Sequence, residues 1–221
     1  MKITLPTDQR TVSVGKLLCI GRNYADHAAE MERDVPDNPM VFLKPATALI
    51  RSGGTVRLPP QSQNVHHEVE LVAVIGTGGR RIPEARALNH VAAYAVGLDI
   101  TARDLQNEAK AQQHPWSVAK GFDTFAPLGP LASASTIDDP QDVELELRRN
   151  GVVQQQASTR NMMFSVARLV HHCSQIFTLV PGDLIYTGTP SGVGPIEDGD
   201  QLEARATGCE PLHVTVARAD A

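Results

Sequence analysis

The chain has 221 residues, of which 42% are apolar and 20% are charged, and its formal net charge is −5. These values are typical of one globular domain that is long enough to bury a sizeable core. The negative charge and the lack of a lysine- and arginine-rich run argue against a nucleic-acid partner. No apolar stretch reaches the length of a membrane span, and the start of the chain has no signal-peptide core before Pro6, so we expect no membrane partner.

The three cysteines, Cys19, Cys173 and Cys209, are odd in number and far apart in the sequence. This pattern predicts reduced thiols in a cytoplasmic protein and not a disulfide framework. No C-x-x-C motif is present, so a zinc site built on cysteine is not indicated.

The first part of the chain predicts short strands separated by loops. Residues 1–15 alternate weakly, which predicts an edge strand or a small hairpin that forms an N-terminal extension to a domain spanning 16–221. Residues 16–21 and 40–45 are apolar runs that end at glycine and at proline, so each predicts a buried strand. Arg22 follows the first of these strands, at a position where loop residues often bind ligands.

Residues 26–33 are rich in alanine and glutamate, which favours a short helix. His27 and Glu30 are three residues apart and would share one helix face. A carboxylate beside an imidazole raises its basicity and fixes its tautomer, as a general base requires. The alternative is a surface histidine–glutamate pair without a catalytic role. The turn-rich residues 34–39 could form, together with this helix, a lid over a ligand.

Residues 64–76 predict a single strand that carries Glu68 and Glu70 on the same side. Positions two apart lie roughly 6.5–7 Å from each other, so both carboxylates can converge on one ion. Asp99 ends a second apolar strand, 91–99, and becomes a third oxygen ligand if the two strands are neighbours. These residues suggest a site for a hard divalent cation. A solvated strand face with two glutamates remains the alternative.

Several further side chains have two interpretations from sequence alone. His66 shares the predicted face of Glu68, and either His66 or His67 could bind a metal or simply satisfy a hydrogen bond. Thr101 begins a helix in the manner of a capping box, with Gln106 one turn further on. Lys44 could contact an anionic substrate or extend its amine into solvent. Lys120 could stabilise developing negative charge or form an ordinary ion pair.

The second half of the chain predicts a hairpin, a helix and a glycine-rich loop. Residues 143–153 alternate and then turn at Asn-Gly, which indicates an antiparallel hairpin with a solvated E-x-E. Ser165 caps an amphipathic helix. The strand 184–187 precedes the loop 188–195, whose glycines allow backbone N–H groups to approach an anion. That loop lacks the lysine of a nucleotide-binding P-loop.

Six segments, found in the same order along the chain, resemble the fumarylacetoacetate hydrolase superfamily, in particular its small acylpyruvate hydrolase and oxaloacetate decarboxylase members. They are GRNYADHAAEM (21–31), FLKP (42–45), HHEVELVAVIG (66–76), LDITARDLQ (98–106), PWSVAKGFD (115–123) and LIYTGTPSGVGP (184–195). The resemblance implies a mixed α/β (α+β) fold of rolled, mixed β-sheets with a few peripheral helices, and it makes 16–221 the catalytic domain. It also implies a homodimer.

The resemblance further implies roles for individual residues. Glu68, Glu70 and Asp99 are expected to bind Mg²⁺, or Mn²⁺, and His27 with Glu30 to form a dyad on a lid over the substrate. Lys120 is expected to be catalytic. Arg22, Gln106 and Thr189 are expected to contact the substrate.

The implied substrate is a small β-keto acid, and the implied reaction is hydrolysis of a carbon–carbon bond in an acylpyruvate such as acetylpyruvate or fumarylpyruvate. The products would be pyruvate and a carboxylic acid, as in the catabolism of aromatic compounds. Oxaloacetate decarboxylation and oxaloacetate keto–enol tautomerisation are alternatives because they use the same metal–enolate site. Isomerisation or decarboxylation of aromatic-degradation dienoates is a further alternative, and a non-catalytic β-rich binding module is the competing class.

Overall fold

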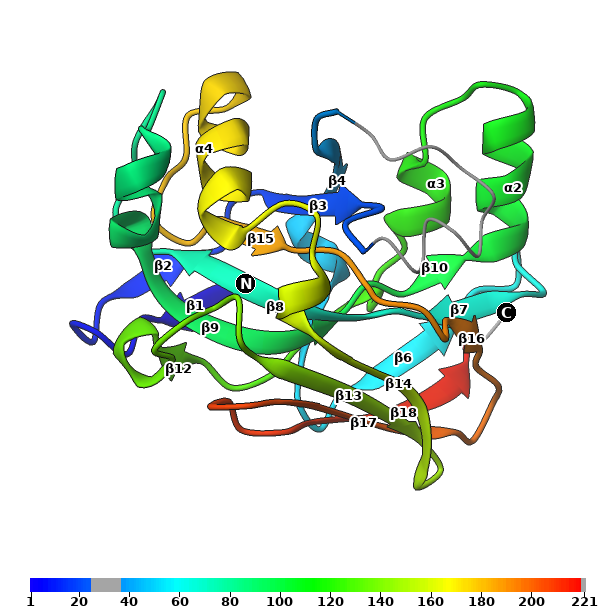
Figure 1. Cartoon of the computed structure of the whole chain (residues 1–221). Helices are drawn as coiled ribbons and strands as arrows, with labels where there is room; N and C mark the ends of the chain where they lie inside the picture. The colour runs from blue at the N-terminus through cyan, green and yellow to red at the C-terminus, as the bar shows by residue number, and fades with distance from the viewer. Residues whose placement is uncertain (25–36, 220–221) are drawn as a thin grey trace.

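A computed structural model describes residues 1–24 and 37–219, and this part of the chain is built mainly of β-strands with a few short helices (Figure 1). The rolled, mixed β-architecture expected from the sequence is confirmed. None of the helices in the described ranges has the length and apolar character needed to cross a membrane.

The largest sheet contains eight strands and is mixed. β15 pairs in parallel with β3 and antiparallel with β8, and β8 pairs antiparallel with β9. The strand order along the sheet is β4 (Met40–Lys44), β3 (Leu17–Gly21), β15 (Leu184–Tyr186), β8 (Val69–Ile75), β9 (Val91–Leu98), β11 (Ala126–Leu128) and β5 (Leu49–Arg51), with β12 (Ala132–Ser133) also paired to β9.

A second sheet of five strands lies below β8 and β9 in Figure 1. Its order is β14 (Val152–Ser158), β13 (Glu144–Arg149), β17 (Gln201–Ala206), β18 (Leu212–Arg218) and β6 (Thr55–Leu58). The predicted hairpin is confirmed, because β13 and β14 pair antiparallel around Asn150 and Gly151, which have φ values of 52° and 81°. Positive φ at both turn residues is typical of the tight type I′ turn.

The remaining strands form two small sheets. One has the order β10 (Thr101–Ala102), β7 (Val65–His67) and β16 (Gly194–Pro195), and the other pairs β1 (Lys2–Thr4) with β2 (Thr11–Ser13). The second is the N-terminal hairpin expected from the sequence. Its Ile3 is buried in the same cluster as Leu17 of β3.

The helices of the described residues are arranged around the sheets (Figure 1). They are α2 (Arg103–Ala111), α3 (Ser117–Lys120), α4 (Val166–Ile176) and the 3₁₀ helices η1 (Ala46–Ala48), η2 (Glu84–His90), η3 (Ala134–Thr136) and η4 (Thr159–Asn161). Ser165 caps α4 as predicted, since its hydroxyl accepts a hydrogen bond from the Arg168 N–H. α2 and α3 lie near the end of the β8–β9 pair that carries the carboxylates.

The hydrophobic core occupies both faces of the large sheet. Every residue of β8 is buried, and alternate residues enter two different clusters. Leu71 and Ala73 lie in the cluster that includes residues of the five-stranded sheet, whereas Val72 and Val74 lie in the cluster that includes Ile3 of the N-terminal hairpin. A strand buried on both faces offers little solvent to a charged side chain, so Glu70 requires polar partners within the protein.

Two expectations from the sequence are wrong in detail. The predicted single strand 64–76 is split at Glu68, because β7 joins the small sheet and β8 joins the large one. Thr101 does not cap the following helix: it belongs to β10 and donates its hydroxyl hydrogen to Asp99 O, and α2 begins at Arg103 without a side-chain cap. In both places pairing with a distant strand overrides the local pattern.

Candidate active site

Three carboxylates converge at one end of the β8–β9 pair. Glu68 lies just before β8 and Asp99 just after β9, and the antiparallel register pairs Val69 with Leu98. The Asp99 N–H donates a 2.8 Å hydrogen bond to Glu68 O, which closes this end of the ladder. With Glu70, they offer carboxylate oxygens that all lie within 4.8 Å of one another, and all three side chains are buried.

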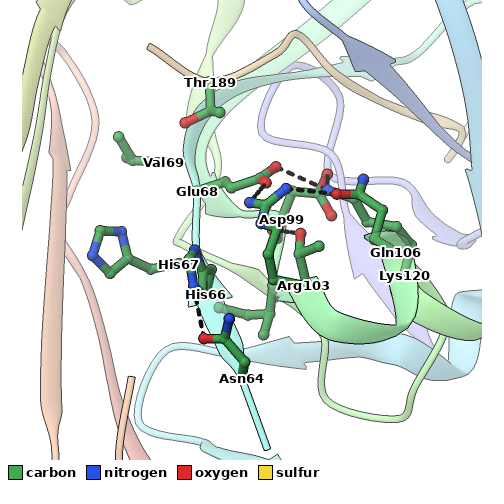
Figure 2. A network of polar contacts seen from close by, with 12 residues as sticks. Asn64, His66, His67, Glu68, Val69, Asp99, Arg103, Gln106, Lys120 and Thr189 are labelled. Atoms are coloured by element: carbon green, nitrogen blue, oxygen red, sulfur yellow. Dashed lines mark hydrogen bonds and ion pairs between the residues drawn. The ribbon is translucent and has the colours of Figure 1, made fainter. Parts of the chain in front are cut away.

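Three cations surround two of these carboxylates. Lys120 Nζ lies 2.8 Å from Glu68 Oε2 and 2.6 Å from Asp99 Oδ2, so it bridges the two acids. Lys44 Nζ forms an ion pair with Asp99 Oδ1, and Arg103 forms one with Glu68 Oε1. Figure 2 shows Glu68, Arg103 and Lys120 gathered around Asp99.

Burial and charge act in opposite directions on this cluster. Burial alone would raise the pKa of Glu68, but Lys120 and Arg103 outweigh it and lower that pKa. Burial would also lower the pKa of Lys120, whereas the carboxylates of Asp99 and Glu68 raise it. Glu68 is therefore ionised and Lys120 is protonated at neutral pH.

Glu70 is in a different electrostatic position. Burial, and then repulsion by Asp99 and Glu68, raises its pKa well above the usual range. Within the part of the chain that the structure describes, no cation is in ion-pair contact with it, and its Oε2 accepts a 2.8 Å hydrogen bond from the Gly188 N–H. The glycine-rich loop thus donates a backbone N–H to a carboxylate of the protein itself, and the expected contact with an anionic ligand stays a prediction.

The donor set fits a hard divalent cation. Three buried carboxylates provide the oxygen ligands that Mg²⁺ and Mn²⁺ prefer. Among the described residues no cation pairs with Glu70, and a bound divalent cation would supply that missing positive charge.

A cavity opens beside the carboxylates, and the predicted substrate contacts line it. Its wall includes Arg22, Gln106 and Thr189 in addition to Lys120. The remaining lining residues are Ile20, Gly21, Met40, Phe42, Glu68, Glu70, Asp99, Arg103, Lys110 and Trp116. The structure thus brings together every predicted site residue that it describes. His27 and Glu30 lie outside the described residues.

The cavity wall combines aromatic rings with positive charge. Phe42 and Trp116 meet edge to face with ring centroids 5.7 Å apart. Lys120 Nζ lies 5.0 Å from the Phe42 ring centre, and Lys110 Nζ lies 5.2 Å from that of Trp116. Gln106 Oε1 accepts hydrogen bonds from Arg103 at 2.6 Å and from Lys110 at 3.2 Å. This arrangement favours a small anionic ligand.

Sequence reasoning missed the contribution of two cations. Lys44 is neither solvated nor exposed to the cavity: it is buried against Asp99 and donates a 3.0 Å hydrogen bond to Ile100 O. Arg103, which pairs with Glu68, is the second cation that the sequence patterns did not single out. Its position four residues after Asp99, in the family-like segment 98–106, was the available signal.

The two histidines before Glu68 take no part in the carboxylate cluster. His66 Nε2 is 2.9 Å from Asn64 Oδ1, and His67 Nδ1 is 3.0 Å from Gln155 Oε1. Burial, and then the nearby Arg103, lowers the pKa of His66 to about 4, so its ring is neutral at pH 7. Figure 2 shows the His67 ring directed away from Glu68. Of the two interpretations, the hydrogen-bonded histidine is the one these contacts match.

The sequence matches a known family over most of its length. A family model described as fumarylacetoacetate (FAA) hydrolase C-terminal matches residues 16–217. One relative is the mitochondrial oxaloacetate tautomerase FAHD1 of Arabidopsis thaliana, which is 44% identical over 92% of this chain and 91% of its own length.

Solved structures share both the fold and much of the sequence. The fumarylpyruvate hydrolase of Pseudomonas aeruginosa, in complex with Mn²⁺ and pyruvate, has a TM-score of 0.92 and 41% identity, and the alignment covers 99% of this chain and 96% of that one. The 5-carboxymethyl-2-hydroxymuconate delta-isomerase of Mycobacterium smegmatis has a TM-score of 0.85 and 43% identity, with coverage of 94% and 80%.

Proposed function

Because this chain belongs to the fumarylacetoacetate hydrolase family, we propose that it is a metal-dependent hydrolase that cleaves acylpyruvates to pyruvate and a carboxylic acid. One observation carries the proposal: Lys120 bridges two members of a buried carboxylate triad beside a cavity rich in cationic side chains. Support comes from the similar hydrolase that was solved with Mn²⁺ and pyruvate.

Glu68, Glu70 and Asp99 are the residues that would hold the metal, which we propose is Mg²⁺, with Mn²⁺ as the alternative. A divalent cation supplies Lewis-acid polarisation of the neighbouring oxygens of a β-dicarbonyl acid. The similar structure with Mn²⁺ supports a divalent ion, and a comparison of the two metals in the same assay decides between them.

The chain's own residues supply the rest of the chemistry. We assign to His27, oriented by Glu30, the removal of a proton from a water that attacks the distal carbonyl. The carbon–carbon bond then breaks, its electron pair passes to a pyruvate enolate, and protonation of that enolate yields pyruvate. The buried Lys120 ammonium stabilises the negative charge that develops on the enolate.

Arg22, Gln106 and Thr189 line the cavity and provide polar contacts to the substrate. Arg22 has a φ of 58°, a conformation that is uncommon for a residue other than glycine. Residues held in such conformations are often found at binding sites.

Oxaloacetate keto–enol tautomerisation is the second candidate, because relatives 44% identical to this chain are named oxaloacetate tautomerases. Oxaloacetate decarboxylation would use the same enolate-stabilising groups. The similarity to a muconate delta-isomerase keeps dienoate isomerisation as a further alternative.

The test is turnover of acetylpyruvate and oxaloacetate side by side, with Mg²⁺ or Mn²⁺ added to protein first treated with EDTA. Loss of enol absorbance and formation of pyruvate are followed together. Faster pyruvate release from acetylpyruvate supports the hydrolase, and faster release from oxaloacetate indicates a decarboxylase. Loss of enol without pyruvate indicates a tautomerase. A lack of turnover with both substrates would reject the proposed substrate class.

We also propose that the protein is a cytoplasmic homodimer that acts on a small molecule. Cys19, Cys173 and Cys209 are free thiols in the structure, in accord with a reducing compartment. Sedimentation of the purified protein tests the dimer, and cell fractionation tests the compartment.

A further inference from the structure

Three consecutive glutamines occupy β14, and the structure buries only the middle one. Gln154 and Gln156 are exposed, whereas Gln155 is 1% exposed. The register of β13 with β14 explains which glutamine is buried. Leu147 pairs with Gln155 and Arg148 pairs with Val153, so Gln154 is an extra residue in a β-bulge. A bulge of this kind re-aims the side chains that follow it. Here it turns Gln155 toward the large sheet, together with the buried Leu147.

Gln155 links the metal-binding segment to the glycine-rich loop. Its Oε1 accepts a 3.0 Å hydrogen bond from the N–H of Val69, the residue between Glu68 and Glu70. Its Nε2 donates to Pro190 O at 3.0 Å and to Thr189 Oγ1 at 2.9 Å. The backbone N–H can only donate and the carbonyl can only accept, so these partners fix which end of the amide is oxygen.

This orientation of the Gln155 amide makes the Thr189 hydroxyl oxygen an acceptor toward Gln155. Thr189 Oγ1 accepts a hydrogen from Gln155, and Gln155 is its only hydrogen-bond partner among the described residues. A hydroxyl that accepts in this way retains its own proton for donation elsewhere. Because Thr189 lines the cavity beside Glu70, that proton is available to an anionic oxygen of a ligand.

We propose that Gln155 is a positioning residue that makes Thr189 a hydrogen-bond donor to a carboxylate or enolate oxygen of the ligand in this cavity. The inference rests on the proposed function only for the class of ligand, a small α-keto acid or its enolate. Gln155 acts through Thr189 and does not itself touch the ligand.

The isosteric variant Gln155→Glu tests this role. Its carboxylate can still accept from Val69 N–H but cannot donate to Thr189, so the Thr189 hydroxyl would donate to Glu instead of to the ligand. We expect oxalate, a dianion that resembles the pyruvate enolate, to bind about tenfold or more weakly at saturating Mn²⁺. Calorimetry gives the oxalate affinity, and titration of Mn²⁺ without oxalate gives the metal affinity, which we expect to change much less.

Comparison with Thr189 variants separates positioning from general support. Thr189→Val should lose oxalate affinity to a similar degree, Thr189→Ser should retain it, and Gln155→Glu combined with Thr189→Val should be no weaker than either change alone. Gln156→Glu, on the same strand but exposed, is the matched control and should bind oxalate as the original protein does. If circular dichroism shows that Gln155→Glu does not fold, Gln155→Met replaces it. This change removes the amide that orients the Thr189 hydroxyl but offers it no strong acceptor, so the loss of oxalate affinity should be smaller than in Thr189→Val and still more than twofold.

Several results would overturn the inference. They are oxalate binding by the Gln155 variant within twofold of the original protein, losses that multiply in the double variant, or an equal loss of Mn²⁺ affinity. A failure of the proposed function looks different: the original protein would bind oxalate in a Gln155-dependent way but would not release pyruvate from acetylpyruvate. A lack of oxalate binding by the metal-loaded original protein would also reject the assigned donor role.

Discussion

The buried Glu70 carboxylate lowers the stability of the metal-free protein, although it is one of the proposed metal ligands. The carboxylate sits in a fully buried strand, with a backbone N–H as its hydrogen-bond partner and two other carboxylates nearby. Burial, followed by repulsion from Asp99 and Glu68, raises its pKa. When a carboxyl group has a higher pKa in the folded state than in the unfolded state, its contribution to stability is fully present at pH values below the unfolded pKa. That contribution is lost as the pH rises through the folded pKa.

We therefore predict that Glu70→Gln stabilises the metal-free protein and removes metal binding. The neutral amide can still accept from Gly188 N–H and no longer repels Asp99. The gain in the free energy of unfolding should be larger at pH 8 than at pH 5, as measured by urea denaturation in EDTA. Glu146→Gln changes a glutamate of the E-x-E on β13, outside the candidate site, and should leave metal affinity unchanged. A Glu70→Gln protein that binds Mn²⁺ normally would refute the ligand assignment.

Replacing Lys120 should change the affinity for a divalent cation and the turnover rate in opposite directions. Lys120→Met removes a positive charge that contacts two of the three carboxylates, so a divalent cation should bind more tightly. The same change removes the charge that stabilises the enolate, so kcat should fall by about 10²–10³. Steady-state kinetics at saturating metal and a separate Mn²⁺ titration measure the two effects. A parallel loss of both would show that Lys120 only holds the site together.

At the scale of elements, Asn23 links three segments, two of which lead directly to the cavity-lining residues Arg22 and Thr189. Its buried Nδ2 donates to Phe164 O at 3.0 Å and to Thr187 O at 2.8 Å, and its Oδ1 accepts from Phe164 N–H at 2.8 Å. The segment after β3, the residue before the α4 cap and the residue before the glycine-rich loop therefore meet at one side chain. This explains why a loop residue beside Arg22 is fully buried.

We predict that Asn23→Ala lowers the free energy of unfolding by roughly 2–4 kcal/mol, because it leaves buried backbone groups without partners. KM should rise as well, since the adjacent Arg22 and the loop with Thr189 lose their common anchor. Chemical denaturation and steady-state kinetics measure these effects. The exposed Asn107 of α2 provides the matched control, and Asn107→Ala should be close to neutral. Equal effects of the two substitutions would argue against the anchoring role.

Local patterns predicted the elements whose partners are close in sequence. The Asn150–Gly151 turn and the Ser165 cap both followed from short-range signals, whereas the pairing of the Glu68 and Asp99 strands was only a condition of the metal-site hypothesis. The break at Glu68 did not, because β7 pairs with β10, where His66 lies opposite Thr101, and with the still more distant β16, where His67 lies opposite Gly194. Pairing of this kind leaves no periodic signal in the strand itself.

The same limit applies to the candidate site. Glu68, Glu70 and Asp99 could be proposed from strand spacing, and family-like segments added Lys120, Gln106 and Thr189. Gln155 could not be found in this way, because it reaches the site from the second sheet and lies in a run of three polar residues. Only the register of β13 with β14 distinguishes it from its neighbours.

At the scale of the whole molecule, the site joins both sheets, so metal binding and global stability should be linked. A ligand that binds only the folded state adds RT ln(1 + [L]/Kd), about 2.7 kcal/mol at a hundredfold excess over Kd. We predict that Mn²⁺ or Mg²⁺ raises the unfolding temperature in a concentration-dependent way. Scanning calorimetry measures the shift. A similar shift in the Glu70→Gln variant would place the bound ion elsewhere.

The three consecutive glutamines in β14 affect the outcome of a register shift between β13 and β14 during folding. When β14 slips by one residue along β13, the faces of the strand are exchanged and most positions receive the wrong side chain. At the position opposite Leu147, however, the residue that arrives is again a glutamine, from either direction. Gln154 or Gln156 would therefore take the place of Gln155 opposite Leu147, and the misregistered hairpin would still carry an amide side chain at that position.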